Sequence, residues 1–162
     1  MARVLSQAVL TEIARLSGLY ADPRSALLPA LHAAQEECGH LGEAAMADVA
    51  QALGLPLSDV TSIATFYSMF HTEPVGRHQI RICTNLSCYL NGCDAVLERL
   101  CRGLGIRPGE TTPDGRVTLE AAECLAACEE APVLLVDADR HPRMTAAAVD
   151  DLLAHLDQDR TG

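Results

Sequence analysis

The sequence predicts an α+β (or α/β) chain in which a helical bundle precedes a small sheet with helices packed on it. Two observations support this. Over residues 1–75 the apolar side chains recur at helical spacing between turn signals, whereas short alternating segments typical of strands begin after residue 76. We therefore expect a helical domain over residues 1–75 and a second domain over residues 76–162 with the order β-α-β-β-β-α.

The first domain is expected to contain four helices. The first covers residues 6–16, where apolar residues follow the period of a helix. Asp22 and Pro23 mark the start of the second, as a capping side chain followed by proline at the first helical position. The last two cover residues 43–53 and 60–70.

The second domain is expected to alternate strands and helices. Ile80 and Ile82 lie two residues apart, as on one face of a strand, and Thr112 to Gly115 form a strong turn signal. The expected elements are a strand over residues 78–83, a helix over 92–104, strands over 116–121, 132–137 and 140–144, and a helix over 145–157.

Composition limits the classes of partner. The net charge of −10 makes nucleic acid and anionic lipid surfaces poor partners. Apolar runs such as residues 131–136 are far shorter than the ~20 residues of a membrane-spanning helix. The first residues lack the apolar stretch and cleavage site of a secretory signal. We expect a cytoplasmic protein that does not insert into a membrane and that docks to something larger.

The seven cysteines include two pairs with a pattern that suggests metal ligation. Cys83 and Cys88 are separated by four residues, and Cys124 and Cys128 by three. Each pair begins where an expected strand runs into a loop, so the two loops can face each other across one gap. Four thiolates at one site suit either a [2Fe–2S] cluster or tetrahedral zinc.

Spacing alone favours the [2Fe–2S] cluster but leaves zinc and unliganded thiols open. Structural zinc sites most often have a two-residue gap in each cysteine pair, which this chain lacks. A Rieske centre needs histidine ligands, and a plant-type ferredoxin places three cysteines in one loop. Of the other thiols, Cys93 lies near enough to the first pair to substitute for a ligand, although packing is the more ordinary role for Cys38, Cys93 and Cys101.

A redox-sensing DNA-binding regulator is the alternative of another class. Residues 53–60 could form a helix-turn-helix corner, but the following helix, over residues 60–70, has no basic side chain. The chain also lacks a glycine-rich dinucleotide fingerprint and a Walker loop. One-electron transfer, rather than hydride transfer, is therefore the expected chemistry.

These motifs together resemble a known family, the thioredoxin-like [2Fe–2S] subunit of NADH:quinone oxidoreductase (the E-type subunit of respiratory complex I). The segment 82–136 carries the resemblance, with the Cys-x₄-Cys pair followed by GIRPGETTPDG (105–115) and ECLAACEEAP (123–132). In the helical half, ALHAAQEECG (30–39) and ATFYSMF (64–70) are similar to the same family.

The resemblance implies a thioredoxin-like second domain and a [2Fe–2S] cluster ligated by Cys83, Cys88, Cys124 and Cys128. It also implies a larger redox complex, peripheral on the cytoplasmic face of the inner membrane. The partner would be a flavoprotein subunit that holds FMN, binds NADH and carries a [4Fe–4S] cluster. Related subunits serve NAD-linked formate dehydrogenases and bidirectional hydrogenases, so the parent complex stays open.

Ala126 departs from the family pattern, which commonly has glycine at this position of the second cysteine loop. Glycine favours a positive φ because it lacks a Cβ atom. Ala126 therefore implies either that this position avoids positive φ here or that the loop tolerates some strain.

Overall fold

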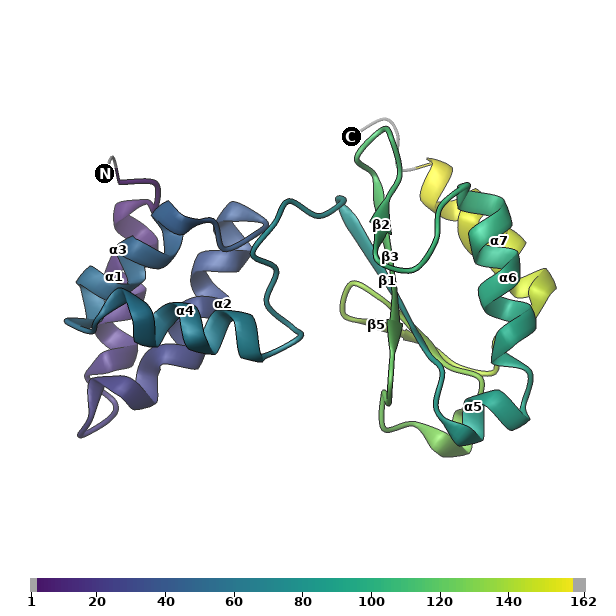
Figure 1. Ribbon diagram of the computed structural model, residues 1–162, viewed down its shortest axis with the longest axis horizontal. Helices are drawn as coiled ribbons and strands as arrows, with labels where there is room; N and C mark the ends of the chain where they lie inside the picture. Colours follow the sequence, from purple (N-terminus) through teal and green to yellow (C-terminus); the bar gives the residue numbers. More distant parts are fainter. Residues whose placement is uncertain (1–2, 159–162) are drawn as a thin grey trace. The chain divides into compact units, whose positions relative to one another are not determined.

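The computed structural model describes residues 3–158 and divides the chain into two compact units, Met1–Pro74 and Val75–Gly162 (Figure 1). The first unit is helical, and the second contains a sheet with helices. Over residues 3–158, no helix is both long and apolar enough to cross a membrane.

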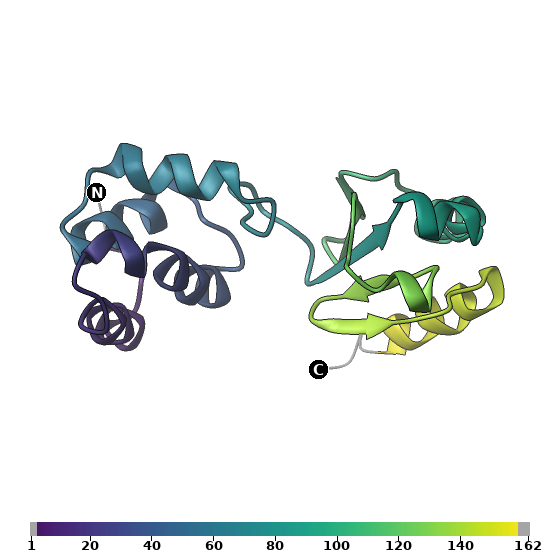
Figure 2. The same ribbon diagram turned by 90° about the horizontal axis from the view of Figure 1, so that it is seen from below.

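The first unit is a bundle whose helices share one core (Figure 2). Each helix contributes a fully buried side chain to it: Ile13, Leu31, Val49 and Val60 from the first to the fourth. The elements are α1 (Gln7–Ser17), a short 3₁₀ helix (Pro23–Ala26), α2 (Leu27–Cys38), α3 (Glu43–Leu53) and α4 (Leu57–Phe66).

Two helices of this unit differ from the expected bounds. The Asp22 side chain does cap a helical turn, accepting the backbone N–H of Arg24 at 2.9 Å, but that turn is 3₁₀ and α2 follows it. The fourth helix begins and ends earlier than residues 60–70. It ends at Phe66, because the backbone of the next residue, Tyr67, is extended (φ −90°, ψ 119°). Phe66 is 77 % exposed.

The second unit is a five-stranded mixed sheet in the order β2-β3-β1-β4-β5. β1 is parallel to β3 and antiparallel to β4. Figure 1 shows α6 and α7 side by side on one face of the sheet. The strands are β1 (His78–Cys83), β2 (Glu110–Thr111), β3 (Val117–Ala122), β4 (Leu134–Val136) and β5 (Asp139–His141); the helices are α5 (Leu86–Leu90), α6 (Cys93–Leu104) and α7 (Ala146–Gln158).

The core of this unit lies between the sheet and α6 and α7. Ile80 and Ile82 of β1 are fully buried there, as the alternation of β1 predicts, and Leu119 is the pairing partner of Ile80. Burying one such side chain contributes roughly 1.5–3 kcal/mol. This core fixes the position of β1 and β3, the strands from which both cysteine loops leave.

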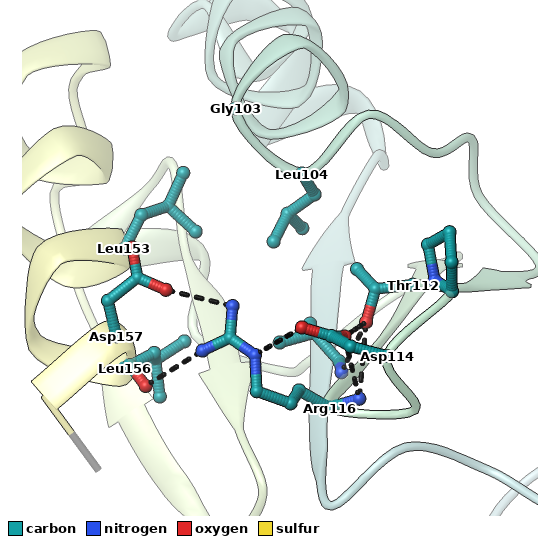
Figure 3. Close-up of a pocket in the computed structure, with 10 residues that line it drawn as sticks. Gly103, Leu104, Thr112, Asp114, Arg116, Leu153, Leu156 and Asp157 are labelled. Carbon is teal, nitrogen blue, oxygen red and sulfur yellow. Dashed lines mark hydrogen bonds and ion pairs between the residues drawn. The ribbon is translucent and has the colours of Figure 1, made fainter. Parts of the chain in front are cut away.

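Arg116 fastens the end of α7 to the turn before β3 (Figure 3). Its Nε lies 2.6 Å from Asp114 Oδ2, and its Nη2 lies 2.8 Å from Asp157 Oδ1. Its Nη1 also donates to the carbonyl oxygen of Leu156 at 3.3 Å, in the last turn of α7. A cation suits this place because the C-terminal end of a helix carries a partial negative charge.

The ion pairs of Arg116 with Asp114 and Asp157 predict a pH dependence of stability. Hydrogen bonds from Thr112 and Arg116 hold the pKa of Asp114 well below its ordinary value. A lowered folded-state pKa means that this contribution is present above the ordinary aspartate pKa and is lost as the pH falls through the folded-state value. We expect Asp114→Asn to lower the urea midpoint at neutral pH. We also expect the free energy of unfolding of this variant to fall less steeply than that of the wild-type chain as the pH is lowered.

The measurement is urea unfolding at a series of pH values from neutral to about pH 3. Asp151→Asn, an exposed aspartate on α7, is the matched control and is expected to keep the wild-type profile. Parallel pH profiles for Asp114→Asn and the wild-type chain would contradict the assignment.

Candidate metal centre

The parallel pairing of β1 and β3 places both cysteine loops at one edge of the sheet. Cys83, the last residue of β1, pairs with Ala122, the last residue of β3. Because parallel strands point the same way, the chain leaves both strands at the same edge. The loop that leads to Cys88 and the loop that carries Cys124 and Cys128 therefore start side by side.

Hydrogen bonds then tie the two loops together. The Thr84 N–H donates to the Ala122 carbonyl oxygen at 2.9 Å. The Ser87 hydroxyl, within α5, donates to the carbonyl oxygen of Cys128 at 3.0 Å. In Figure 1, α5 lies next to the light-green loop that contains this cysteine. The two pairs predicted from the sequence thus share one region, although they are about 40 residues apart in the chain.

The four cysteines differ in exposure. Cys83 and Cys88 are buried, at 3 % and 1 % exposed, whereas Cys124 and Cys128 are exposed. Burial raises the pKa of the Cys88 thiol to about 11. Without a metal this thiol is therefore protonated at neutral pH, and metal binding must displace its proton. The candidate site therefore has a buried side and a side open to solvent.

Backbone N–H groups point at two of the sulfurs. The Ala126 N–H donates to Cys124 Sγ at 3.3 Å. The Val133 N–H donates to the Cys88 sulfur and partly opposes the effect of burial on its pKa. Such N–H···S hydrogen bonds stabilise thiolate ligands and tune the potential of iron–sulfur clusters. The donor set and its surroundings therefore fit an iron–sulfur cluster.

The arrangement of the side chains does not distinguish zinc from [2Fe–2S]. Over residues 3–158, no three His, Cys, Asp or Glu side chains are placed to hold a single metal ion, and this applies to the four cysteines as much as to any other set. One pair of cysteines is buried and the other is exposed. The choice of cofactor therefore comes from the family to which the chain belongs.

Comparison with known proteins decides the family. The sequence profile of the family described as "Thioredoxin-like [2Fe-2S] ferredoxin" matches residues 8–157. The chain belongs to this family. The thioredoxin-like fold and the [2Fe–2S] cofactor expected from the motifs are thereby confirmed.

Relatives in this family cover most of the chain. An E-type subunit (E 2) of the NADH-quinone oxidoreductase of Rhizobium meliloti (strain 1021) is 51 % identical over 142 residues, which are 88 % of this chain and 84 % of that protein. The E-type subunit of the Escherichia coli (strain K12) NADH-quinone oxidoreductase is 42 % identical over 83 % of this chain and 81 % of its own length.

A solved structure agrees with the fold. The NAD⁺-reducing [NiFe]-hydrogenase in the air-oxidized state has a chain that matches 83 % of this one with a TM-score of 0.74 and 30 % identity. This chain spans only 23 % of that hydrogenase chain. This chain is therefore similar both to separate E-type subunits and to one part of a larger hydrogenase chain.

Sequence reasoning missed α5, the short helix that carries Cys88 and Ser87. Five residues are too few to show a helical period. A usable signal was Asn85, whose side chain accepts the Leu86 N–H at 2.8 Å, because asparagine is a favoured helix cap.

Cys93 is fully buried at the start of α6 and lies near the first cysteine pair. Burial and the charges of Asp94 and Cys83 raise the pKa of its thiol.

Ala126 adopts a positive φ of 53°, a conformation that favours glycine, although it carries a Cβ atom. The sequence left two possibilities open. The prediction that Ala126 avoids a positive φ is wrong, and the prediction that the loop tolerates some strain is the one that agrees with the structure. A left-handed backbone costs a residue with a Cβ atom roughly 1–2 kcal/mol.

We expect Ala126→Gly to raise the free energy of unfolding by about 0.5–1 kcal/mol, because the relieved strain exceeds the greater entropy of glycine in the unfolded chain. Denaturant unfolding measures this. Ala154→Gly makes the same chemical change on an exposed position of α7 and is expected to cost about 0.5–1 kcal/mol. If Ala126→Gly lost as much stability as Ala154→Gly, the claim that the backbone at Ala126 is strained would be wrong.

Proposed function

We propose that Cys83, Cys88, Cys124 and Cys128 ligate the [2Fe–2S] cluster of this chain. The observation that carries the proposal is the parallel pairing of β1 and β3, which ends at Cys83 and so brings both cysteine loops to one edge of the sheet. The bond from Ser87 to the Cys128 carbonyl oxygen supports it further, because it holds the loops together at the ligand positions.

The chain is an electron-transfer subunit of the NADH:quinone oxidoreductase type, as its relatives at 40–51 % identity indicate. Its partner in the complex is a flavoprotein subunit that holds FMN, binds NADH and carries a [4Fe–4S] cluster. A place in an NAD-linked hydrogenase is the second candidate, favoured by the match to part of the NAD⁺-reducing [NiFe]-hydrogenase.

The residues of this chain hold and tune the cofactor and take no part in hydride chemistry. The cluster supplies the ability to accept and donate one electron at a time. Burial at Cys83 and Cys88 keeps water from one side, and the N–H groups of Ala126 and Val133 stabilise sulfur charge. Exposure at Cys124 and Cys128 leaves a short route to a partner.

Single cysteine substitutions test the ligand set. We expect Cys83→Ala, Cys88→Ala, Cys124→Ala and Cys128→Ala each to lose most of the visible absorption and the EPR signal of the reduced cluster. The reason is that each removes one of four thiolates required by a [2Fe–2S] centre. Iron and acid-labile sulfide in the wild-type protein are expected in equal amounts, about two of each per chain.

Cys101→Ala is the matched control, since Cys101 lies on α6 and its loss should leave the spectra unchanged. Full retention of the wild-type cluster by any one of the four variants would remove that cysteine from the ligand set. A colourless wild-type protein that binds zinc would overturn the proposal as a whole.

Acidic side chains beside the second pair are expected to lower the reduction potential. Glu129 is exposed and adjacent to Cys128, and reduction adds a negative charge to an already anionic cluster. We expect Glu129→Gln to raise the midpoint potential by roughly 10–40 mV, because one charge at ~10 Å in a dielectric of ~40 is worth that much for one electron.

Potentiometric EPR titration measures the shift. Asp139→Asn is the matched control, because Asp139 is exposed on β5 at the end of the strand away from the cysteines. Solvent and salt screen a charge at that distance more strongly, so a smaller shift is expected. A midpoint potential in Glu129→Gln equal to or below the wild-type value would reject the electrostatic effect.

A further inference from the structure

The second cysteine loop ends in a short turn that is tied to β5. Cys128, Glu129 and Glu130 form one turn of 3₁₀ helix, so Glu130 lies two residues after a proposed ligand. The Glu130 carboxylate pairs with Arg140 of β5, with 3.3 Å between Glu130 Oε2 and Arg140 Nε. The Glu130 carbonyl oxygen also accepts the Arg143 N–H at 2.8 Å. Both the side chain and the backbone of Glu130 are therefore held by β5 and the residues that follow it.

The Glu130 carboxylate lies where it needs a counterion. Its Oε2 atom is buried and, within residues 3–158, has no hydrogen-bond partner. The Arg140 guanidinium is the positive charge that faces this oxygen. A buried carboxylate oxygen that loses its counterion is costly, because no water or other donor replaces the lost interaction. Without Arg140, the loop lowers this cost by moving Glu130 outward, which displaces Cys128 as well.

Ser87 and Arg140 hold this turn from two different elements. Ser87 of α5 donates to the Cys128 carbonyl oxygen at 3.0 Å, whereas Arg140 holds Glu130 from the edge strand β5. The Cys128 side chain is exposed, so packing contributes less to its position than it does for buried Cys88. The two polar anchors therefore set where Cys128 lies.

Arg140 also brings a positive charge to an acidic loop. Glu123, Glu129 and Glu130 flank the second cysteine pair, and the sequence has no lysine or arginine from residue 120 to residue 139. Reduction adds a negative charge to an anionic cluster, so a cation held nearby favours the reduced form. The ion pair with Glu130 keeps the Arg140 charge next to the turn that contains Cys128.

We propose that Arg140 is a positioning residue for the [2Fe–2S] cluster: through Glu130 it holds the turn that carries Cys128, and its charge offsets that of Glu130. This inference rests on the proposed function, and it adds a residue that acts through another one to the proposed ligand set. Arg140 lies outside both cysteine motifs, and its ion pair with Glu130 is what assigns it this role.

Potentiometric EPR titration of the cluster-loaded chain tests the effect of charge. Arg140→Gln is expected to lower the ratio of reduced to oxidised cluster at a fixed potential about twofold, which corresponds to a midpoint about 18 mV lower for one electron. Glu130→Gln is expected to shift the midpoint in the opposite direction. The double variant Glu130→Gln/Arg140→Gln carries no net charge at these two positions, as in the wild-type chain, and should return to the wild-type midpoint. Arg140→Lys keeps the charge and should stay close to it.

The rate of cluster loss tests the hold on the loop. After EDTA is added under anaerobic conditions, the visible absorption of Arg140→Gln is expected to bleach about threefold faster than that of the wild-type chain, because a partly buried ion pair is lost. The double variant should bleach no faster than Arg140→Gln, since the two side chains act as a pair. Arg140→Lys is expected to bleach more slowly than Arg140→Gln.

Arg102→Gln is the matched control. Arg102 also pairs with a glutamate, Glu98, at 3.5 Å, but it lies in the last turn of α6, whereas Cys93 and the cysteine loops lie at the start of that helix. This variant is expected to bleach at the wild-type rate. Its midpoint should shift by less than that of Arg140→Gln, because distance and salt screen the charge.

Two results would overturn the positioning role while leaving the ligand set in place. One is a wild-type midpoint in both Arg140→Gln and Glu130→Gln, and the other is a wild-type bleaching rate in Arg140→Gln. A wild-type chain that shows no [2Fe–2S] EPR signal after reduction would overturn the proposed function as well.

Circular dichroism separates a local effect from a general one. If Arg140→Gln holds too little cluster to titrate but keeps the wild-type spectrum, the hold on the loop is supported, and Glu130→Gln then carries the test of the midpoint. A changed spectrum would mean that Arg140 supports the fold as a whole, and it would overturn the positioning role.

Discussion

The parallel pairing of β1 with β3 is the constraint on which the candidate site depends. Cys83 and Ala122 end their strands opposite each other, so two loops far apart in sequence start from one edge. The buried core between the sheet and α6 and α7 holds both strands rigidly. The sheet thus sets where the two cysteine loops begin, while the loops supply hydrogen bonds and exposure.

Hydrogen bonds within and between the two cysteine loops add to the position that the strands set. Ser87 joins α5 to the second loop, and the N–H groups of Ala126 and Val133 face sulfur atoms. The strained backbone at Ala126 fits this account, since the same residue that adopts the positive φ directs its N–H toward Cys124. The loop geometry at this sulfur thus comes at a cost in stability.

Much of the fold could be predicted from the sequence, because helical and strand periods are set by residues buried on one face. Ile80 and Ile82 identified β1 in this way. The placement of the cysteine pairs at strand ends followed, but spacing alone left zinc open, and the resemblance of whole motifs decided for [2Fe–2S]. β2, with two residues, was not predictable because its strand character comes from pairing with β3. The φ of Ala126 is likewise imposed by the surrounding loop.

The contrast between buried Cys83 and Cys88 and exposed Cys124 and Cys128 also sets which thiols meet the solvent. Oxidation of cysteine follows thiolate character and exposure. Reagents in solution therefore reach the outer pair first, while the protein itself covers the inner pair.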